Sequence, residues 1–142
     1  MRSIEVRDGV FFLVFDRGDD IIETLRRFAT ERGIRAGRFD ALGAVERATI
    51  AWWSWEAKQY VRRDLDQQCE VAALIGDIAV EGDKTKVHAH VVLGPEGNAA
   101  LAGHLVSGVV RPTLEMQLVR YDKPLVRRKD PETQLSLIAV DA

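Results

Sequence analysis

A succession of short β-like runs separated by short links is the feature of this sequence that most constrains its fold. The runs are Gly37–Ala44, Arg47–Trp55, Gln59–Leu65, Cys69–Val80, Lys86–Leu93 and Thr113–Tyr121. Most links between them are only a few residues long, so they can join antiparallel neighbours but cannot contain the helical crossover of a parallel sheet. The sequence therefore predicts an antiparallel sheet within an α+β fold.

One amphipathic helix is predicted over Asp20–Arg32. Asp20, with Glu23 three residues later, resembles a capping box in which Asp replaces Ser. The apolar residues that follow fall on one helical stripe: Ile21, Ile22, Leu25, Phe28 and Ala29. Gly33 provides the left-handed residue that commonly follows a helix, so the helix is expected to end there.

The remaining segments are expected to join these elements in a single domain over residues 1–142, which is the usual length of one domain. Val10–Phe15 is β-branched and aromatic between turn residues, which indicates a buried strand. After Pro124 and Pro131, the segment Gln134–Val140 indicates a last strand or a docking segment.

Composition argues against several classes of protein. Lys and Arg number 20 against 22 Asp and Glu, a net charge of -2, without the basic excess typical of a dedicated nucleic-acid binder. The first residues lack the basic segment and apolar run of a secretory signal, and no apolar run near them approaches the roughly 20 residues of a membrane span. Cys69 is the only cysteine, so no internal disulfide can form, which is typical of a reducing compartment. We expect a cytoplasmic protein without membrane contact.

All of the histidines lie close together in the sequence, at His88, His90 and His104. Alternate side chains of a strand share a face, so His88 and His90 project together, whereas Val87 and Ala89 take the opposite, apolar face. The turn-forming residues between His90 and His104 predict a hairpin.

The hairpin predicts where His104 lies. If its tip centres on Glu96, His104 faces His88 across the ladder, and His90 is a diagonal neighbour on the same face. A slip of one residue would send His104 to the other face. The three imidazoles are therefore expected to converge.

Three neutral imidazoles bind Zn²⁺ at about 2.0 to 2.1 Å and leave a fourth position open, as in catalytic zinc sites. A water or a small ligand could occupy that position, and such a site usually needs a nearby acid, for which Asp77 and Glu115 are candidates. Imidazole also suits Ni²⁺, Cu²⁺ and Fe²⁺, so a divalent metal is predicted with zinc as the first expectation. The alternative is that the histidines only form hydrogen bonds within the sheet.

Several motifs together resemble the plant and prokaryote conserved (PPC) domain over nearly the whole chain. They are VHAHVVLG at 87–94, AGHL at 102–105, VRPTLE at 110–115, ALGAV at 41–45 and EVAALIGDI at 70–78. The resemblance implies an antiparallel, roughly seven-stranded sheet flanked by helices, assembled as a homotrimer, with His88, His90 and His104 able to hold a metal. Ala102 departs from the family, in which a second glycine is frequent at this position.

The resemblance also raises a second function. Plant members of the family join this domain to an AT-hook, an Arg-Gly-Arg-Pro segment that enters the minor groove of DNA, and this sequence contains no such segment. A DNA-associated regulator would therefore depend on phosphate contacts from Arg62, Arg63, Arg127 and Arg128. A third hypothesis is a structural or interaction module with an empty site, and none of the three names a reaction.

Aromatic and glycine residues within the runs allow two interpretations each. Trp52, Trp53 and Trp55 would form a stacking platform for bases, or would pack in the core or a subunit interface, with Trp53 and Trp55 on one face of a strand. The packing interpretation is favoured. Gly43 and Gly76 indicate bulges or close backbone approach.

Overall fold

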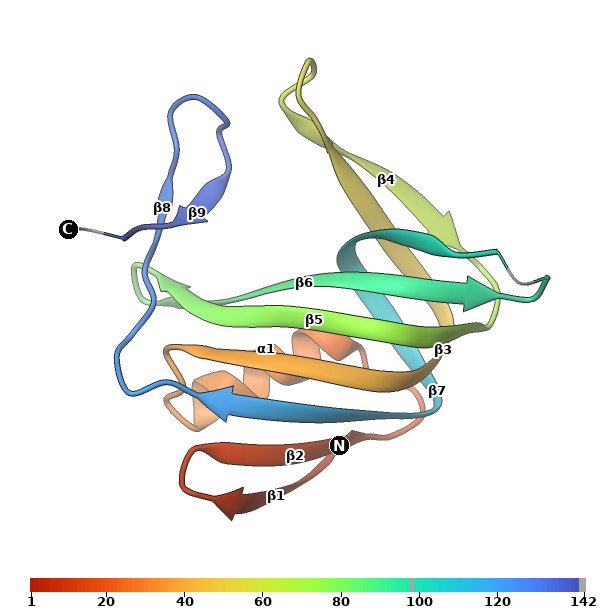
Figure 1. The fold of residues 1–142 in the computed structure, drawn as a ribbon, viewed down its shortest axis with the longest axis horizontal. Coiled ribbons are helices and arrows are strands. Elements are labelled where there is room, and N and C mark those ends of the chain that lie inside the picture. Colours follow the sequence, from red (N-terminus) through yellow and green to blue (C-terminus); the bar gives the residue numbers. More distant parts are fainter. Residues whose placement is uncertain (98, 141–142) are drawn as a thin grey trace.

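The computed structural model describes residues 1–97 and 99–140, most of which lie in β-strands (Figure 1). The elements are β1 (Arg2–Arg7), β2 (Val10–Phe15), α1 (Ile21–Glu31), β3 (Gly37–Ser54), β4 (Gln59–Leu65), β5 (Cys69–Glu81), β6 (Lys84–Pro95), β7 (Leu101–Arg120), β8 (Arg127–Lys129) and β9 (Ser136–Ile138). Strands β1 to β7 form one seven-stranded antiparallel sheet, and β8 and β9 form a separate hairpin. The predicted antiparallel sheet is confirmed.

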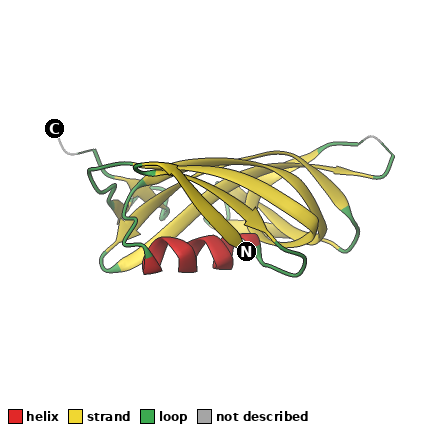
Figure 2. Ribbon diagram, turned by 90° about the horizontal axis from the view of Figure 1, so that it is seen from below, coloured by secondary structure: helices red, strands yellow, loops and turns green. Residues whose placement is uncertain are grey.

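One helix, and not several, accompanies the sheet within the described residues, so the expectation of flanking helices is corrected. Helix α1 lies against one side of the curled sheet (Figure 2). Asp20 is its N-cap, where the side chain accepts a hydrogen bond of 3.0 Å from the Glu23 backbone N–H. Gly33 follows the helix with a φ of +63°, as predicted. The predicted stripe packs inward through Ile21, Leu25, Phe28 and Ala29.

The sheet closes on itself because β3 and β7 are long and pair along both halves. Strand β3 pairs with β7 on one side and with β5 and β4 on the other, so β3, β5, β6 and β7 form a closed ring. The separately predicted runs Gly37–Ala44 and Arg47–Trp55 are thus one strand. The register shifts at Gly43, whose φ is +152°, and a Cβ there would lie 2.4 Å from the carbonyl oxygen of Thr113. The predicted bulge therefore lets the two strands bend together at close range.

The core lies on the face of the sheet that α1 covers, and takes residues from β2 and α1 as well as from the ring strands. Its largest fully buried side chains include Phe15, Phe39, Leu74, Leu93 and Leu114. Residues that alternate with buried ones along β6 consequently face outward, away from α1.

The C-terminal hairpin attaches to the end of β5. The Val80 backbone N–H donates to the Leu125 carbonyl over 2.8 Å, and Val80 forms a parallel bridge with Val126. The predicted last strand over Gln134–Val140 is shorter than expected, because β9 covers only Ser136–Ile138. No helix in the described part of the chain is both long enough and apolar enough to cross a membrane.

Candidate metal centre

The three histidines meet on the outer face of the sheet, where β6 lies beside the start of β7. His88 and His90 flank Ala89, whose side chain is buried in the core, so both imidazoles point away from the core. Potential ligand nitrogens of His88, His90 and His104 all lie within 4.8 Å of one another. The centroid of the His88 ring is 5.2 Å from the ring centroid of His90 and 5.2 Å from that of His104. The predicted convergence is confirmed.

The register of the hairpin differs from the prediction by two residues. His104 lies opposite His90, which makes His88 the diagonal neighbour. The hairpin is centred on Gly97, which has a φ of +98°, and not on Glu96. Because side chains alternate with a period of two, a shift of two residues keeps His104 on the predicted face.

His88 contacts a carboxylate, which in turn binds a buried guanidinium. Asp77 lies opposite His88 on β5, and its Oδ2 is 3.3 Å from the His88 Nδ1. Arg127 donates from Nη2 to the Asp77 Oδ1 and from Nη1 to the Ser136 carbonyl, each over 2.7 Å. When the His88 Nδ1–H donates to this carboxylate, the Nε2 lone pair stays available for a ligand. Carboxylates orient metal-binding imidazoles in this way.

Only one of the two predicted acids reaches the cluster. Asp77 does so, whereas Glu115 lies eleven residues beyond His104 on β7, opposite Leu42. Arg127, one of the four arginines on which the DNA hypothesis depends, is only 9% exposed and is bonded to Asp77, which disfavours a phosphate contact at this residue. The contact joins residues 50 positions apart, and no local pattern in the sequence indicates it.

Burial keeps two of the imidazoles neutral. Desolvation, followed by repulsion from His88, His90 and Arg127, lowers the pKa of His104 to about 4. Desolvation and His88 also lower the pKa of His90. Desolvation opposes ionisation of Asp77, but the hydrogen bonds from His88 and Arg127 together outweigh it and hold the pKa of this carboxyl below its ordinary value. At neutral pH, the His90 and His104 rings are therefore neutral, and the Asp77 carboxylate is ionised.

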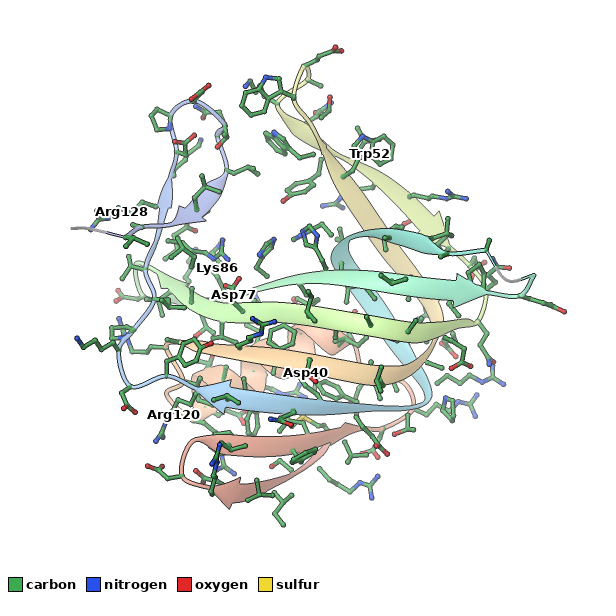
Figure 3. All side chains as sticks on the ribbon, viewed as in Figure 1. Asp40, Trp52, Asp77, Lys86, Arg120 and Arg128 are labelled. Carbon is green, nitrogen blue, oxygen red and sulfur yellow. The ribbon has the colours of Figure 1, made fainter. Side chains whose placement is uncertain are left out.

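Aromatic side chains of the β3–β4 hairpin cover His104. Tyr60 stacks on the His104 ring with centroids 4.8 Å apart, and Trp53 meets Tyr60 edge-on at 5.2 Å. Trp52 is exposed (Figure 3). Trp55 is also exposed and lies in the turn after β3, so the prediction that it shares a strand face with Trp53 is wrong. The tryptophan run is divided between the site and the surface.

A groove of about 620 Å³ opens beside the cluster. All three histidines line it, together with residues of the β3–β4 hairpin on one side and of the β8–β9 hairpin on the other (Figure 1). Lys86, two residues before His88 on β6, also lines this groove. The volume is within the range of small-molecule sites.

The donor set fits a divalent metal ion. Within residues 1–97 and 99–140, the His104 Nδ1 is one of few buried polar side-chain atoms without a hydrogen-bond partner. Three imidazoles, one of them oriented by a carboxylate, match the ligands that zinc uses in open sites. His88, His90 and His104 are the residues that would hold such an ion.

Comparison with known protein families gives a match over most of the chain. The model of the Plants and Prokaryotes Conserved (PCC) domain matches residues 3–122, which include the three histidines and Asp77 but not Arg127. Comparison with curated proteins found no match.

Several solved structures share the fold, among them the following three. A metal-containing protein from Archaeoglobus fulgidus is 32% identical, with a TM-score of 0.85 over 92% of this chain and 93% of that one. A plant- and prokaryote-conserved protein from Pyrococcus horikoshii is 25% identical, with a TM-score of 0.87 over 99% and 96%. A protein from Bacteroides thetaiotaomicron, provisionally described as DNA-binding, is 23% identical, with a TM-score of 0.93 over 97% and 96%.

Proposed function

The chain belongs to the Plants and Prokaryotes Conserved domain family, and we propose that it is a metal-binding member of this family. In this proposal His88, His90 and His104 hold one divalent metal ion, and zinc is the first expectation. The observation that supports this proposal is the convergence of three imidazole nitrogens on the outer face of the sheet. The 32% identical protein from Archaeoglobus fulgidus is metal-containing, which adds support. We propose further that the site binds a small ligand or activates water.

The side chains around the site have separate tasks in this proposal. Asp77 fixes the ring orientation of His88, and Arg127 holds Asp77 in place and ionised. Tyr60 covers one face of the His104 ring and limits the access of water to it. A zinc ion held by three imidazoles supplies an open coordination position and can lower the pKa of its bound water to about 7.

Metal analysis of untagged protein tests the proposal. We expect about one zinc per chain after dialysis against dilute zinc, and loss of that zinc in the His88→Ala and His104→Ala variants. Gln68→Ala is the control, because Gln68 is exposed in the link before β5 and does not line the groove. Zinc below one tenth per chain in the natural protein, or equal zinc in the histidine variants, would refute the metal site.

We also propose that the protein forms the homotrimer that the family resemblance implies. Exposed apolar residues on the outer face of the sheet support this proposal. Ile4, Phe12 and Ile75 are 62%, 44% and 50% exposed. The strand registers place them on one rung of the outer face, with the exposed residues Gln117 and Asp40 between Phe12 and Ile75. Apolar surface of this kind marks interaction sites. Light scattering should give three times the chain mass, and Phe12→Glu should reduce it. A monomer at all concentrations would contradict the proposal.

DNA binding is the weaker candidate. The relative described as DNA-binding is 23% identical, which supports a shared fold only. The net charge of -2 is unfavourable, and Arg127 is occupied by Asp77. We expect affinity for duplex DNA no tighter than about 10⁻⁴ M at physiological salt, the weak end of non-specific binding. A salt titration of binding to labelled duplex measures this.

A further inference from the structure

The unpartnered buried polar atoms of the described side chains all belong to residues of the groove beside the histidines. They are the Nε1 of Trp53, the Nδ1 of His104 and the Nε of Arg127. The indole and guanidinium N–H groups can only donate hydrogen bonds. Buried donors without partners are costly and rare in folded proteins, so two of them in one groove indicate an acceptor that binds there.

The charged groups that line this groove, the histidines aside, are cationic. Lys86 and Arg127 line it, and its described lining contains no carboxylate. Lys86 forms a surface ion pair of 3.0 Å with Glu81, in which both side chains are more than one third exposed. Arg127 uses Nη1 and Nη2 for Ser136 and Asp77, which leaves its Nε–H unused. The groove thus presents two cationic side chains and unused N–H donors, while the carboxylates that pair with these cations, Asp77 and Glu81, lie outside its lining.

Most of the rest of the groove wall is aromatic or aliphatic. The rings of Trp53 and Tyr60 form one side, next to His104. Leu135 and Leu137, from the β8–β9 hairpin, also line it. Surfaces of this kind favour a planar apolar body that aromatic and aliphatic side chains can contact.

We propose that the groove binds a small organic anion with a flat apolar body, whose carboxylate accepts hydrogen bonds from the N–H groups of Trp53 and Arg127. The proposal rests on the proposed metal site, because an ion held by the histidines would attract the same carboxylate, but the two donors belong to the protein alone. Both nitrogens are shielded from solvent, so side chains of the wall must move slightly when the ligand enters.

The test compares benzoate with its neutral analogue benzamide, by calorimetric titration at constant ionic strength, in protein samples whose zinc content is measured. Benzoate should bind at least about tenfold more tightly than benzamide, and acetate, which lacks the ring, more weakly than benzoate. Trp53→Phe keeps an aromatic ring but removes the indole N–H, and should weaken benzoate binding about tenfold. Trp55→Phe is the matched control, because Trp55 lies in the exposed turn outside the groove.

Equal affinities for benzoate and benzamide would overturn the proposal, whether or not zinc is present. If Trp53→Phe fails to fold, Arg127→Lys replaces it, since lysine keeps the charge but lacks the Nε–H, with Arg63→Lys as control. Unchanged benzoate affinity in the folded variant also overturns the proposal. Absence of zinc from the same samples would refute the metal site alone, because the comparison of benzoate with benzamide is then made on the metal-free groove.

Discussion

Replacing Asp77 by Asn should weaken zinc binding about tenfold, because the change keeps the shape of the side chain but removes its charge. Loss of a residue that orients a metal ligand typically costs 10- to 100-fold in affinity, or about 1.4 to 2.7 kcal/mol. The contact from Asp77 to the His88 Nδ1 is long, at 3.3 Å, so the lower end of this range applies. The 2.7 Å bond from Arg127 is the stronger contact, and its loss should mainly reduce stability.

Competition between the protein and a chelator of known zinc affinity measures this difference. Asp64→Asn is the matched control, because Asp64 is an exposed carboxylate bonded to Thr49 on the other hairpin. A thermal melt of the metal-free variants separates the two effects: a fall in melting temperature reports the lost Arg127 contact, whereas the zinc affinity reports the orientation of His88. Zinc affinity within twofold of the natural protein, in a folded Asp77→Asn variant, would refute the orienting role.

Three further predictions concern the metal-free protein. The pKa of His104 falls from 6.5 to about 4 on folding, so the unfolded chain binds more protons than the folded chain between these pH values. The free energy of unfolding should therefore fall by about 1 kcal/mol from pH 7 to pH 5, after allowance for the partial exposure of this side chain. Urea unfolding at the two pH values measures this change. Gly76→Ala should destabilise the fold by more than about 3 kcal/mol, because the new Cβ would lie 2.2 Å from the His88 carbonyl oxygen; a near-normal melting temperature contradicts this. Asp20→Ala removes the cap on the Glu23 N–H and should cost about 1 kcal/mol, which thermal unfolding detects.

The histidine cluster could be predicted from the sequence because it depends on short-range rules. The period of two places His88 and His90 on one face, and the hairpin brings back His104 on the same face even when the register is two residues off. A local pattern needs no knowledge of the rest of the fold. The cap at Asp20 and the stop at Gly33 were predictable for the same reason.

The surroundings of the cluster were not predictable because they depend on long-range pairing. Arg127 reaches Asp77 only because the C-terminal hairpin packs against the end of β5, and its position in a charged segment indicated a surface residue. Tyr60 reaches His104 because β3 pairs with both β4 and β7. Pairing between segments far apart in the sequence decides both contacts, and no single segment encodes it.

The β8–β9 hairpin should therefore be dispensable for folding but not for the full function of the site. Leu118 is the last residue of the main core cluster within the described part of the chain. A chain that ends at Asp122 keeps this core and should unfold cooperatively. That chain retains the three histidines but loses Arg127, so Asp77 is less firmly held, and zinc affinity should fall about threefold to tenfold.

The same truncation removes Leu135 and Leu137, together with one of the two proposed donors, from the groove. Because all three zinc ligands stay, whereas Arg127 and the two leucines of the groove are lost, preference for benzoate over benzamide should decrease more than zinc affinity does. Circular dichroism, zinc competition and benzoate titration on the shortened chain measure the three quantities. If zinc affinity and benzoate preference both match those of the full chain, the hairpin contributes to neither, and the contact of Arg127 with Asp77 has no role in binding.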